Sequence, residues 1–236
     1  MTKDNSSKRV LITRPEPGAT ETAGRLLLLG HYPVVAPVLE IDTRNLSAPE
    51  AAAATLLTSR NAVAACHPSL HRRPAFAVGA ATAALAVQAG FTRVLNANAD
   101  ANTLTGLVAD TLSPAAGSLF FPAGQGQGME LATALRQRGF HVIRRIAYRA
   151  NGVPVLPEAA ASHLRQGKLT AAMFFSGETA RHFVNLLQLA GLTEAVRDVE
   201  AVSISAKAAV ALKLLPWRCL GTAAEPNQDA MLVLLP

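Results

Sequence analysis

The chain has 236 residues, of which half are apolar and few are aromatic, and its formal net charge is +6. This length allows one large domain or two smaller ones, and abundant alanine and leucine favour helices packed on sheets over an all-β sandwich. The basic charge suits an acidic partner, either nucleic acid or a polyanionic small molecule. Scattered basic residues without an aromatic–basic signature count against nucleic acid, and no apolar run is long enough to span a membrane.

The two cysteines, Cys66 and Cys219, are far apart in the sequence and form no CxxC motif. We therefore predict two buried, reduced thiols in a cytoplasmic protein. Among the histidines, only His67 and His71 have helical i,i+4 spacing, and Pro68 between them interrupts the helix. We expect no metal site.

The first predicted element is a strand at residues 10–13, an apolar run that Pro15 and Pro17 bring to an end. Apolar residues at helical spacing follow as far as Gly30, which is placed as a C-terminal cap. A second strand at residues 34–36 completes one βαβ unit.

Residues 39–44 alternate between apolar and polar, which is typical of an extended segment with one wet face. The next predicted strands are 52–58, 76–78 and 94–95. A helix follows the first of these strands, with Ser59 as its N-cap, and two further helices are predicted at 80–88 and 103–112.

The following stretch repeats the plan of the chain's start: a buried strand, a glycine-rich loop, a helix ending at a glycine, and an extended exit as far as residue 149. A shift of 109 positions places Ile12 on Phe121, Ala23 on Ala132, Leu26 on Leu135, Gly30 on Gly139 and Val34 on Ile143, without a gap. We interpret this as a half-domain repeat.

The last part of the chain shows a second, weaker match. Its predicted strands are 171–175, 200–204 and a short one at Leu220, and its helices are 159–166, 179–190, 206–214 and 229–235. Residues 58–62 resemble 175–179 at an offset of 117, and residues 76–82 resemble 202–208 at an offset of 126. The units therefore follow the order A, B, A′, B′.

If each domain takes one unit of each kind, the chain ends form one domain and the middle of the chain forms the other. We predict an α/β protein of two similar parallel-sheet domains, the first discontinuous. The expected domains are 1–38 with 152–236, and 45–146, joined by a two-stranded linker of residues 39–44 and 147–151.

Candidate site residues lie where strands turn into helices, because ligands of open parallel sheets bind at the carboxyl ends of strands. Thr58, Ser59 and Ser176 are either helix caps or ligand contacts. Arg14 is either a carboxylate clamp or a surface arginine. Tyr148 either donates a hydrogen bond or proton, or packs between domains.

The loop at residues 124–128 precedes a helix, so its backbone N–H groups favour an anion, although it also fits a plain turn. It is not a dinucleotide fingerprint, because Met129 stands where GxGxxG needs glycine. No Ser–His–Asp or Cys–His set can be assembled from the sequence.

Taken together in order, several segments resemble the uroporphyrinogen-III synthase family over roughly residues 9–235. They are Val-Leu-Ile-Thr-Arg-Pro at 10–15, Pro-Val-Val-Ala-Pro at 33–37, Thr-Ser-Arg-Asn-Ala-Val at 58–63, Ala-Val-Gly at 77–79, Phe-Pro-Ala-Gly at 121–124, Ala-Tyr-Arg at 147–149 and Ala-Glu-Pro at 224–226.

The resemblance implies two flavodoxin-like α/β domains and a cofactor-free lyase of heme and tetrapyrrole biosynthesis. Such an enzyme closes hydroxymethylbilane, a polycarboxylate, to uroporphyrinogen III with inversion of ring D through a spiro intermediate. It implies a small-molecule partner. From the sequence itself we expect a cytoplasmic protein that binds neither nucleic acid nor membrane, and nothing in the sequence demands more than a monomer. By this resemblance Tyr148 assists departure of the hydroxyl. The candidate substrate-binding residues are Arg14, Thr58, Ser59, Asn61, Gly79, Gly124, Ser176, Ser205 and Lys207.

Three positions depart from the family's pattern. Phe175 stands where the family usually has threonine, Ala123 where it commonly has arginine, and Ala208 in a turn that usually carries a hydroxyl. Lys207 is a candidate replacement for that hydroxyl as an anion contact. These departures motivate an alternative, a non-enzymatic two-lobed tetrapyrrole-binding or regulatory protein on the same scaffold.

Overall fold

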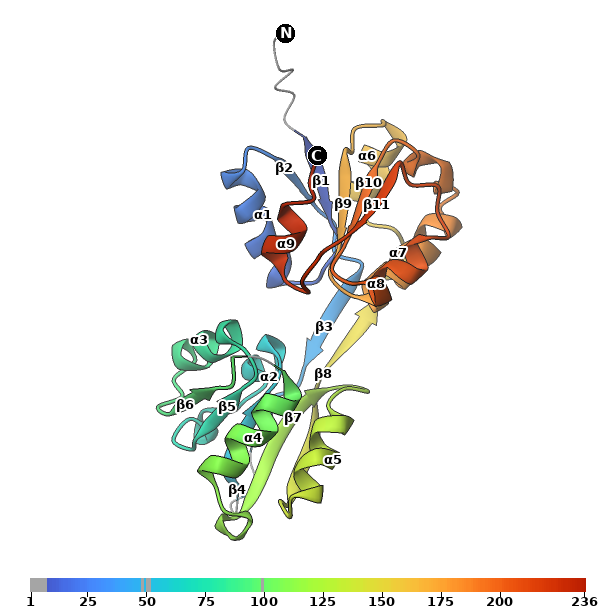
Figure 1. Cartoon of the computed structure of the whole chain (residues 1–236). Helices are drawn as coiled ribbons and strands as arrows, with labels where there is room; N and C mark the ends of the chain where they lie inside the picture. The colour runs from blue at the N-terminus through green and yellow to red at the C-terminus, as the bar shows by residue number, and fades with distance from the viewer. Residues whose placement is uncertain (1–7, 48, 50–51, 99) are drawn as a thin grey trace. The chain divides into compact units, whose positions relative to one another are not determined.

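The structure, a computed structural model, describes residues 8–47, 49, 52–98 and 100–236 (Figure 1). The chain divides into two compact units. One comprises the described residues up to Glu40 together with Asn151–Pro236, and the other comprises the described residues of Ile41–Ala150. The first unit is therefore discontinuous in sequence.

The first unit is a five-stranded sheet in the order β11-β10-β9-β1-β2, and all its strand pairs are parallel. Its strands are β1 (Arg9–Ile12), β2 (Tyr32–Val35), β9 (Ala171–Phe174), β10 (Glu200–Ser203) and β11 (Cys219–Thr222). Its helices are α1 (Gly18–Leu28), α6 (Glu158–Arg165), α7 (Gly177–Leu189), α8 (Ala206–Leu212) and α9 (Gln228–Leu232), with a 3-10 turn, η3 (Thr193–Val196).

Helices cover both faces of this sheet, which explains why its strands are continuous apolar runs. Val10 and Ile12 of β1 pack with α1 and α9, where Leu26 and Met231 are fully buried. Strand neighbours point to opposite faces. On β9, Phe174 stacks edge-to-face with Phe183 of α7 and with Trp217.

The second unit is built on a six-stranded sheet in the order β3-β8-β7-β4-β5-β6, in which β3 begins and β8 ends on residues of the first unit. Its strands are β3 (Leu39–Thr43), β4 (Ala52–Leu57), β5 (Ala75–Ala77), β6 (Val94–Asn96), β7 (Ser118–Gly124) and β8 (Val142–Gly152). Its helices are α2 (Arg60–Ala64), α3 (Ala80–Gln88), α4 (Ala101–Thr111) and α5 (Met129–Gln137), with 3-10 turns η1 (Pro68–Leu70) and η2 (Pro114–Ala116). β3 and β8 are neighbours, and their arrows point in opposite directions in Figure 1.

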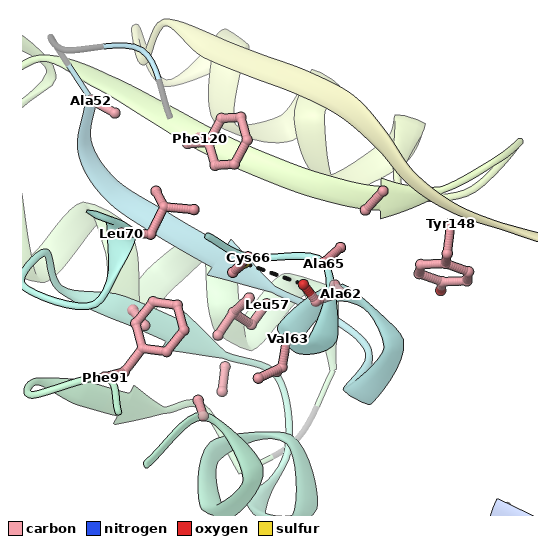
Figure 2. Packing of buried hydrophobic residues seen from close by; sticks show 14 residues of the cluster. Ala52, Leu57, Ala62, Val63, Ala65, Cys66, Leu70, Phe91, Phe120 and Tyr148 are labelled. Carbon is pink, nitrogen blue, oxygen red and sulfur yellow. Dashed lines mark hydrogen bonds between the residues drawn. The ribbon is translucent and has the colours of Figure 1, made fainter. Parts of the chain in front are cut away.

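Two hydrophobic clusters cover the two faces of the second sheet. One gathers Leu57 and Phe120 with residues of α2 and α3, and Tyr148 belongs to it (Figure 2). The other gathers Leu56 and Phe121 with residues of α4 and α5. Because consecutive residues of a strand face opposite sides, Leu56 and Leu57 serve different clusters, as do Phe120 and Phe121.

The predicted half-domain repeat is confirmed by strand register. Leu11 of β1 pairs with Val34 of β2, and a shift of 109 positions gives the observed pair of Phe120 on β7 with Ile143 on β8. The helix-ending glycines, Gly30 and Gly139, are equivalent in the same way, and both have positive φ, +79° and +87°.

The weaker repeat is confirmed by the same test. Leu57 of β4 pairs with Ala77 of β5, and offsets of 117 and 126 give the observed pair of Phe174 on β9 with Ser203 on β10. The sheet order β2-β1-β9-β10-β11 thus corresponds to β8-β7-β4-β5-β6. The two units therefore share one strand arrangement. The half that comes first in the sequence of the first unit, β1 and β2, corresponds to the half that comes last in the second unit, β7 and β8.

The prediction of two buried thiols was right for Cys66 and wrong for Cys219. Cys66 is buried in the second unit, and its thiol donates to the carbonyl of Ala62 at 3.2 Å (Figure 2). Cys219 is exposed at the start of β11, an edge strand, because an edge position lacks a neighbouring strand to cover it. Burial raises the pKa of Cys66 from 9.0 to about 12.

We expect a thiol-specific disulfide reagent to modify only Cys219 rapidly in the native protein, because the thiolate is the reactive form and burial keeps Cys66 protonated. Counting reacted thiols before and after unfolding in urea measures this, with Cys219→Ser as the variant that removes the fast reaction. Two fast-reacting thiols in the wild-type protein would contradict the burial of Cys66.

The same thiol makes stability depend on pH. The native state keeps the Cys66 proton that the unfolded chain releases, so the free energy of unfolding falls as pH rises from 9.0 to about 12. Cys66→Ala removes this part of the pH dependence.

Candidate functional site

A candidate site lies at the carboxyl edge of the second sheet. The strand order reverses at β4, which has β5 on one side and β7 on the other, and such a switch point leaves a crevice where ligands bind. A cavity of about 480 Å³ lies there, a size typical of small-molecule sites. It is lined by Thr58 after β4, Val78 after β5, Ala101 of α4, and residues 126–131 of the glycine-rich loop and α5.

The helix N-termini beside this cavity favour a negatively charged group. Residues in the first turns of α4 and α5 line it, and the N-terminal N–H groups of a helix lack partners within the helix. At α4, the side chain of Asp100 already accepts from the N–H of Thr103. Gly126 and Gly128 have positive φ, +71° and +77°, a conformation that suits glycine. Glu130, in the first turn of α5, is the charged side chain among the lining residues, and its carboxylate opposes an anion there.

The net charge of the second unit reinforces this preference. Residues 41–150 contain ten arginines, no lysine and five acidic residues, so this part of the sequence carries +5 of the net +6. An excess of one sign attracts ligands of the opposite sign over longer distances than single contacts do. The second unit is therefore the better candidate for binding a polyanionic small molecule.

Tyr148 lies on β8 opposite Gly124 of β7, with only 5% of its surface exposed. Its hydroxyl donates a hydrogen bond to Oε1 of Gln127, 2.8 Å away. Burial raises the pKa of Tyr148, and a side-chain hydrogen bond with Ser59 opposes this shift. The phenol is therefore neutral at neutral pH and keeps a proton to donate.

Gly124, predicted to contact substrate, has a clear packing role. It is buried within β7, and a Cβ atom added there would lie 2.8 Å from Cζ of Tyr148 and 2.7 Å from Oε1 of Gln127. Only glycine allows the phenol and the glutamine amide to meet at this point.

Arg144 holds the same loop from the neighbouring strand. Its guanidinium donates from Nε to the carbonyl of Gln127 at 2.8 Å, and from Nη2 to the carbonyl of Gly124 at 2.9 Å. The N–H of Gln127 also donates to the carbonyl of Gly124 at 3.1 Å. Sequence reasoning selected only Gly124 from this network as a candidate contact. Gln127 lies in the loop at residues 124–128 that the sequence indicated, but neither Gln127 nor Arg144 was selected.

The other predicted residues of the second unit gather at the same sheet edge. Ser59 is the N-cap of α2 and accepts from the N–H of Asn61 at 3.2 Å, while Thr58 lines the cavity. Gly79 is the N-cap of α3, with an extended backbone and open space where a Cβ would lie. Neither conformation nor packing requires glycine at Gly79.

The predicted serines of the first unit lie at the carboxyl edge of its own sheet. Ser176 and Ser205 are N-caps, accepting from the N–H groups of Thr179 at 3.1 Å and Ala208 at 3.2 Å. Lys207 is exposed in the first turn of α8. Helix capping therefore accounts for both serines without a ligand.

Arg14 is half-buried rather than a free surface arginine. Its guanidinium lies 4.1 Å from the centre of the Phe175 ring, a cation–π contact. Nη1 donates to Oε1 of Gln228 at 3.0 Å and to Oγ1 of Thr22 at 3.3 Å. Phe175 is thus a platform for Arg14, a role the sequence did not reveal.

Within the described ranges, no group of three or more histidine, cysteine, aspartate or glutamate side chains is placed to hold a metal ion. None of the helices in those ranges is both long and apolar enough to cross a membrane.

These features define a class: a protein of two α/β units related by a permuted internal repeat, with a small-molecule cavity at a switch point. A family model described as Uroporphyrinogen-III synthase HemD matches residues 20–233. The chain belongs to the uroporphyrinogen-III synthase family.

Two solved structures are similar to the chain in fold. Uroporphyrinogen-III synthetase from Helicobacter pylori has a TM-score of 0.64 at 18% identity, covering 96% of this chain and 97% of that one. A mutant uroporphyrinogen III synthase from the extremely thermophilic bacterium Thermus thermophilus has a TM-score of 0.51 at 17% identity, covering 96% of each chain. Comparison with curated protein sequences finds no match.

We expect Gly124→Ala to lower the free energy of unfolding by about 1–3 kcal/mol, because the added methyl group overlaps Tyr148 and Gln127. Denaturant unfolding followed by circular dichroism measures this. Gly106→Ala is the matched control: Gly106 lies inside α4 with open space around its Cβ position, so the change should stabilise by about 0.5–1 kcal/mol. Equal stability of the two variants would refute the close approach at Gly124.

Proposed function

We propose that the protein is a uroporphyrinogen-III synthase, a lyase that closes hydroxymethylbilane to uroporphyrinogen III while inverting ring D. The observation that carries this proposal is the family match over residues 20–233, which includes both units rather than one shared module. The cavity and the buried phenol, which Gln127 connects to it, support the same reading.

The substrate's carboxylates are the groups that the protein is proposed to bind. In the second unit, the N–H groups at the start of α5 and the hydroxyl of Thr58 are the proposed ligands. Each charge-assisted hydrogen bond contributes roughly 1.5–3 kcal/mol, so a few are enough to hold one carboxylate-bearing ring. Arg14, Ser176, Ser205 and Lys207 are proposed contacts for carboxylates in the first unit.

Tyr148 is proposed to assist the first chemical step. The carbon–oxygen bond of the hydroxymethyl group breaks with its electron pair going to oxygen, and the phenol proton converts the leaving group to water. The substrate is left as an azafulvene cation, balanced by the phenolate.

The substituted carbon of ring D then attacks this cation to form a spiro intermediate. Fragmentation and reclosure of that intermediate give the inverted ring, and the proton lost from the pyrrole carbon that closes the ring returns to the phenolate. Holding the reacting groups in position contributes a large part of such a barrier reduction, so orientation is the protein's main task. None of these steps requires a bound cofactor, and the proposal takes the protein to be a cytoplasmic monomer.

The function is tested by supplying hydroxymethylbilane and separating the product isomers by chromatography after oxidation. We expect the type III isomer to form well above the uncatalysed background, because unguided closure gives the type I isomer. Only the type I isomer at the background rate would remove the enzyme proposal and leave a binding protein.

Tyr148→Phe should lower kcat by about 10²-fold, because it removes the proton donor while keeping the ring. Steady-state kinetics on the type III product measures this, with circular dichroism to check folding. Tyr32→Phe is the control, since Tyr32 is the chain's other tyrosine and is 51% exposed on β2. Equal loss in both variants, or none in either, would take the role away from Tyr148.

A further inference from the structure

Gln127 connects the cavity to the buried phenol. It lines the cavity, whereas Tyr148 is not among the lining residues. Its side-chain amide is also the hydrogen-bond acceptor of the Tyr148 hydroxyl, at 2.8 Å. A group bound in the cavity therefore reaches the phenol most directly through this amide.

The backbone of Gln127 is held by hydrogen bonds, whereas its side-chain amide is held through the oxygen atom and, among the described residues, not through the nitrogen atom. The guanidinium of Arg144 holds the carbonyls of Gln127 and Gly124, which anchors both sides of the turn. In the part of the chain that the structure describes, the amide nitrogen of Gln127 has no hydrogen-bond partner. The side chain is also exposed, so it has space to rotate.

A glutamine amide carries an acceptor and a donor at equivalent places, and a half-turn about its last bond exchanges them. With the oxygen towards Tyr148, as observed, the phenol proton is directed to the loop. With the nitrogen towards Tyr148, the phenol oxygen accepts a hydrogen bond from the amide, in addition to its side-chain hydrogen bond with Ser59. Its proton is then available to a leaving group, and the phenolate that remains is stabilised.

We propose that Gln127 is a positioning residue for Tyr148, and that a donor in the cavity, such as a pyrrole N–H of the substrate, draws its amide oxygen away from the phenol. The amide nitrogen then faces the phenol oxygen, and the phenol proton turns towards the departing hydroxyl. This inference rests on the proposed function.

Two substitutions separate positioning from packing. Gln127→Met keeps the length of the side chain and removes both hydrogen-bonding groups. Gln127→Glu keeps an acceptor but, when ionised, has no donor. Gln137→Glu is the matched control for charge, because Gln137 is exposed at the end of α5 and lines no part of the cavity.

We expect kcat for the type III isomer to fall about tenfold or more in Gln127→Met and Gln127→Glu, with little change in KM, because the lost interaction is made in the transition state. The loss in Gln127→Glu should shrink as pH is lowered from about 8 to about 5, since protonation restores a donor to the carboxyl group. Gln137→Glu should match the wild type at every pH. A raised KM with unchanged kcat would instead show a plain binding contact and overturn the inference.

A second readout does not depend on turnover. In a Tyr32→Phe background, Tyr148 is the sole tyrosine, so tyrosinate absorbance follows its ionisation alone. Both Gln127 substitutions should raise the titration midpoint of Tyr148, and Gln137→Glu should not. An unchanged midpoint would overturn the link between the two residues. If the wild type makes only the type I isomer, the proposed function fails, and this titration still decides whether Gln127 governs the phenol.

Discussion

The architecture depends on parallel pairing between strands that are remote in the sequence. In the first unit β1 pairs with β9, with Val10 opposite Ala171, and in the second unit β4 pairs with β7. Thr13 adds a buried hydrogen bond across the first of these pairs, to the carbonyl of Met173 at 2.7 Å. Without this pairing each half-repeat would expose a strand edge, whose unpaired N–H and C=O groups are costly to bury.

The same pairing creates the site. Joining two half-repeats side by side reverses the strand order at the junction, and the loops leaving adjacent strands then diverge to opposite faces of the sheet. In the second unit this junction holds the cavity. β8 lies next to β7 and supplies two residues of the site. Arg144 anchors the glycine-rich loop, and Tyr148 donates a hydrogen bond to the side chain of Gln127 in that loop.

The two units share a backbone plan but differ in chemistry at equivalent positions. By the offsets of the repeats, Arg14 corresponds to Ala123, and Phe175 corresponds to Thr58. In the first unit the guanidinium of Arg14 lies 4.1 Å from the centre of the Phe175 ring. In the second unit the side chains at these positions are smaller, and Thr58 lines the cavity. The same backbone plan therefore presents an arginine–aromatic pair in one unit and a hydroxyl beside a cavity in the other.

The sequence alone determined the order of strands and helices, the repeat and its offsets, and the caps at Ser59 and Ser176. These features depend on local periodicity and turn chemistry, which neighbouring residues carry. Only the tertiary structure decided that Cys219 is exposed, that Gly124 makes room for Tyr148, and that Gln127 joins the cavity to the phenol. Each of these depends on which remote strand lies alongside, and a residue's own sequence neighbours carry no record of that contact.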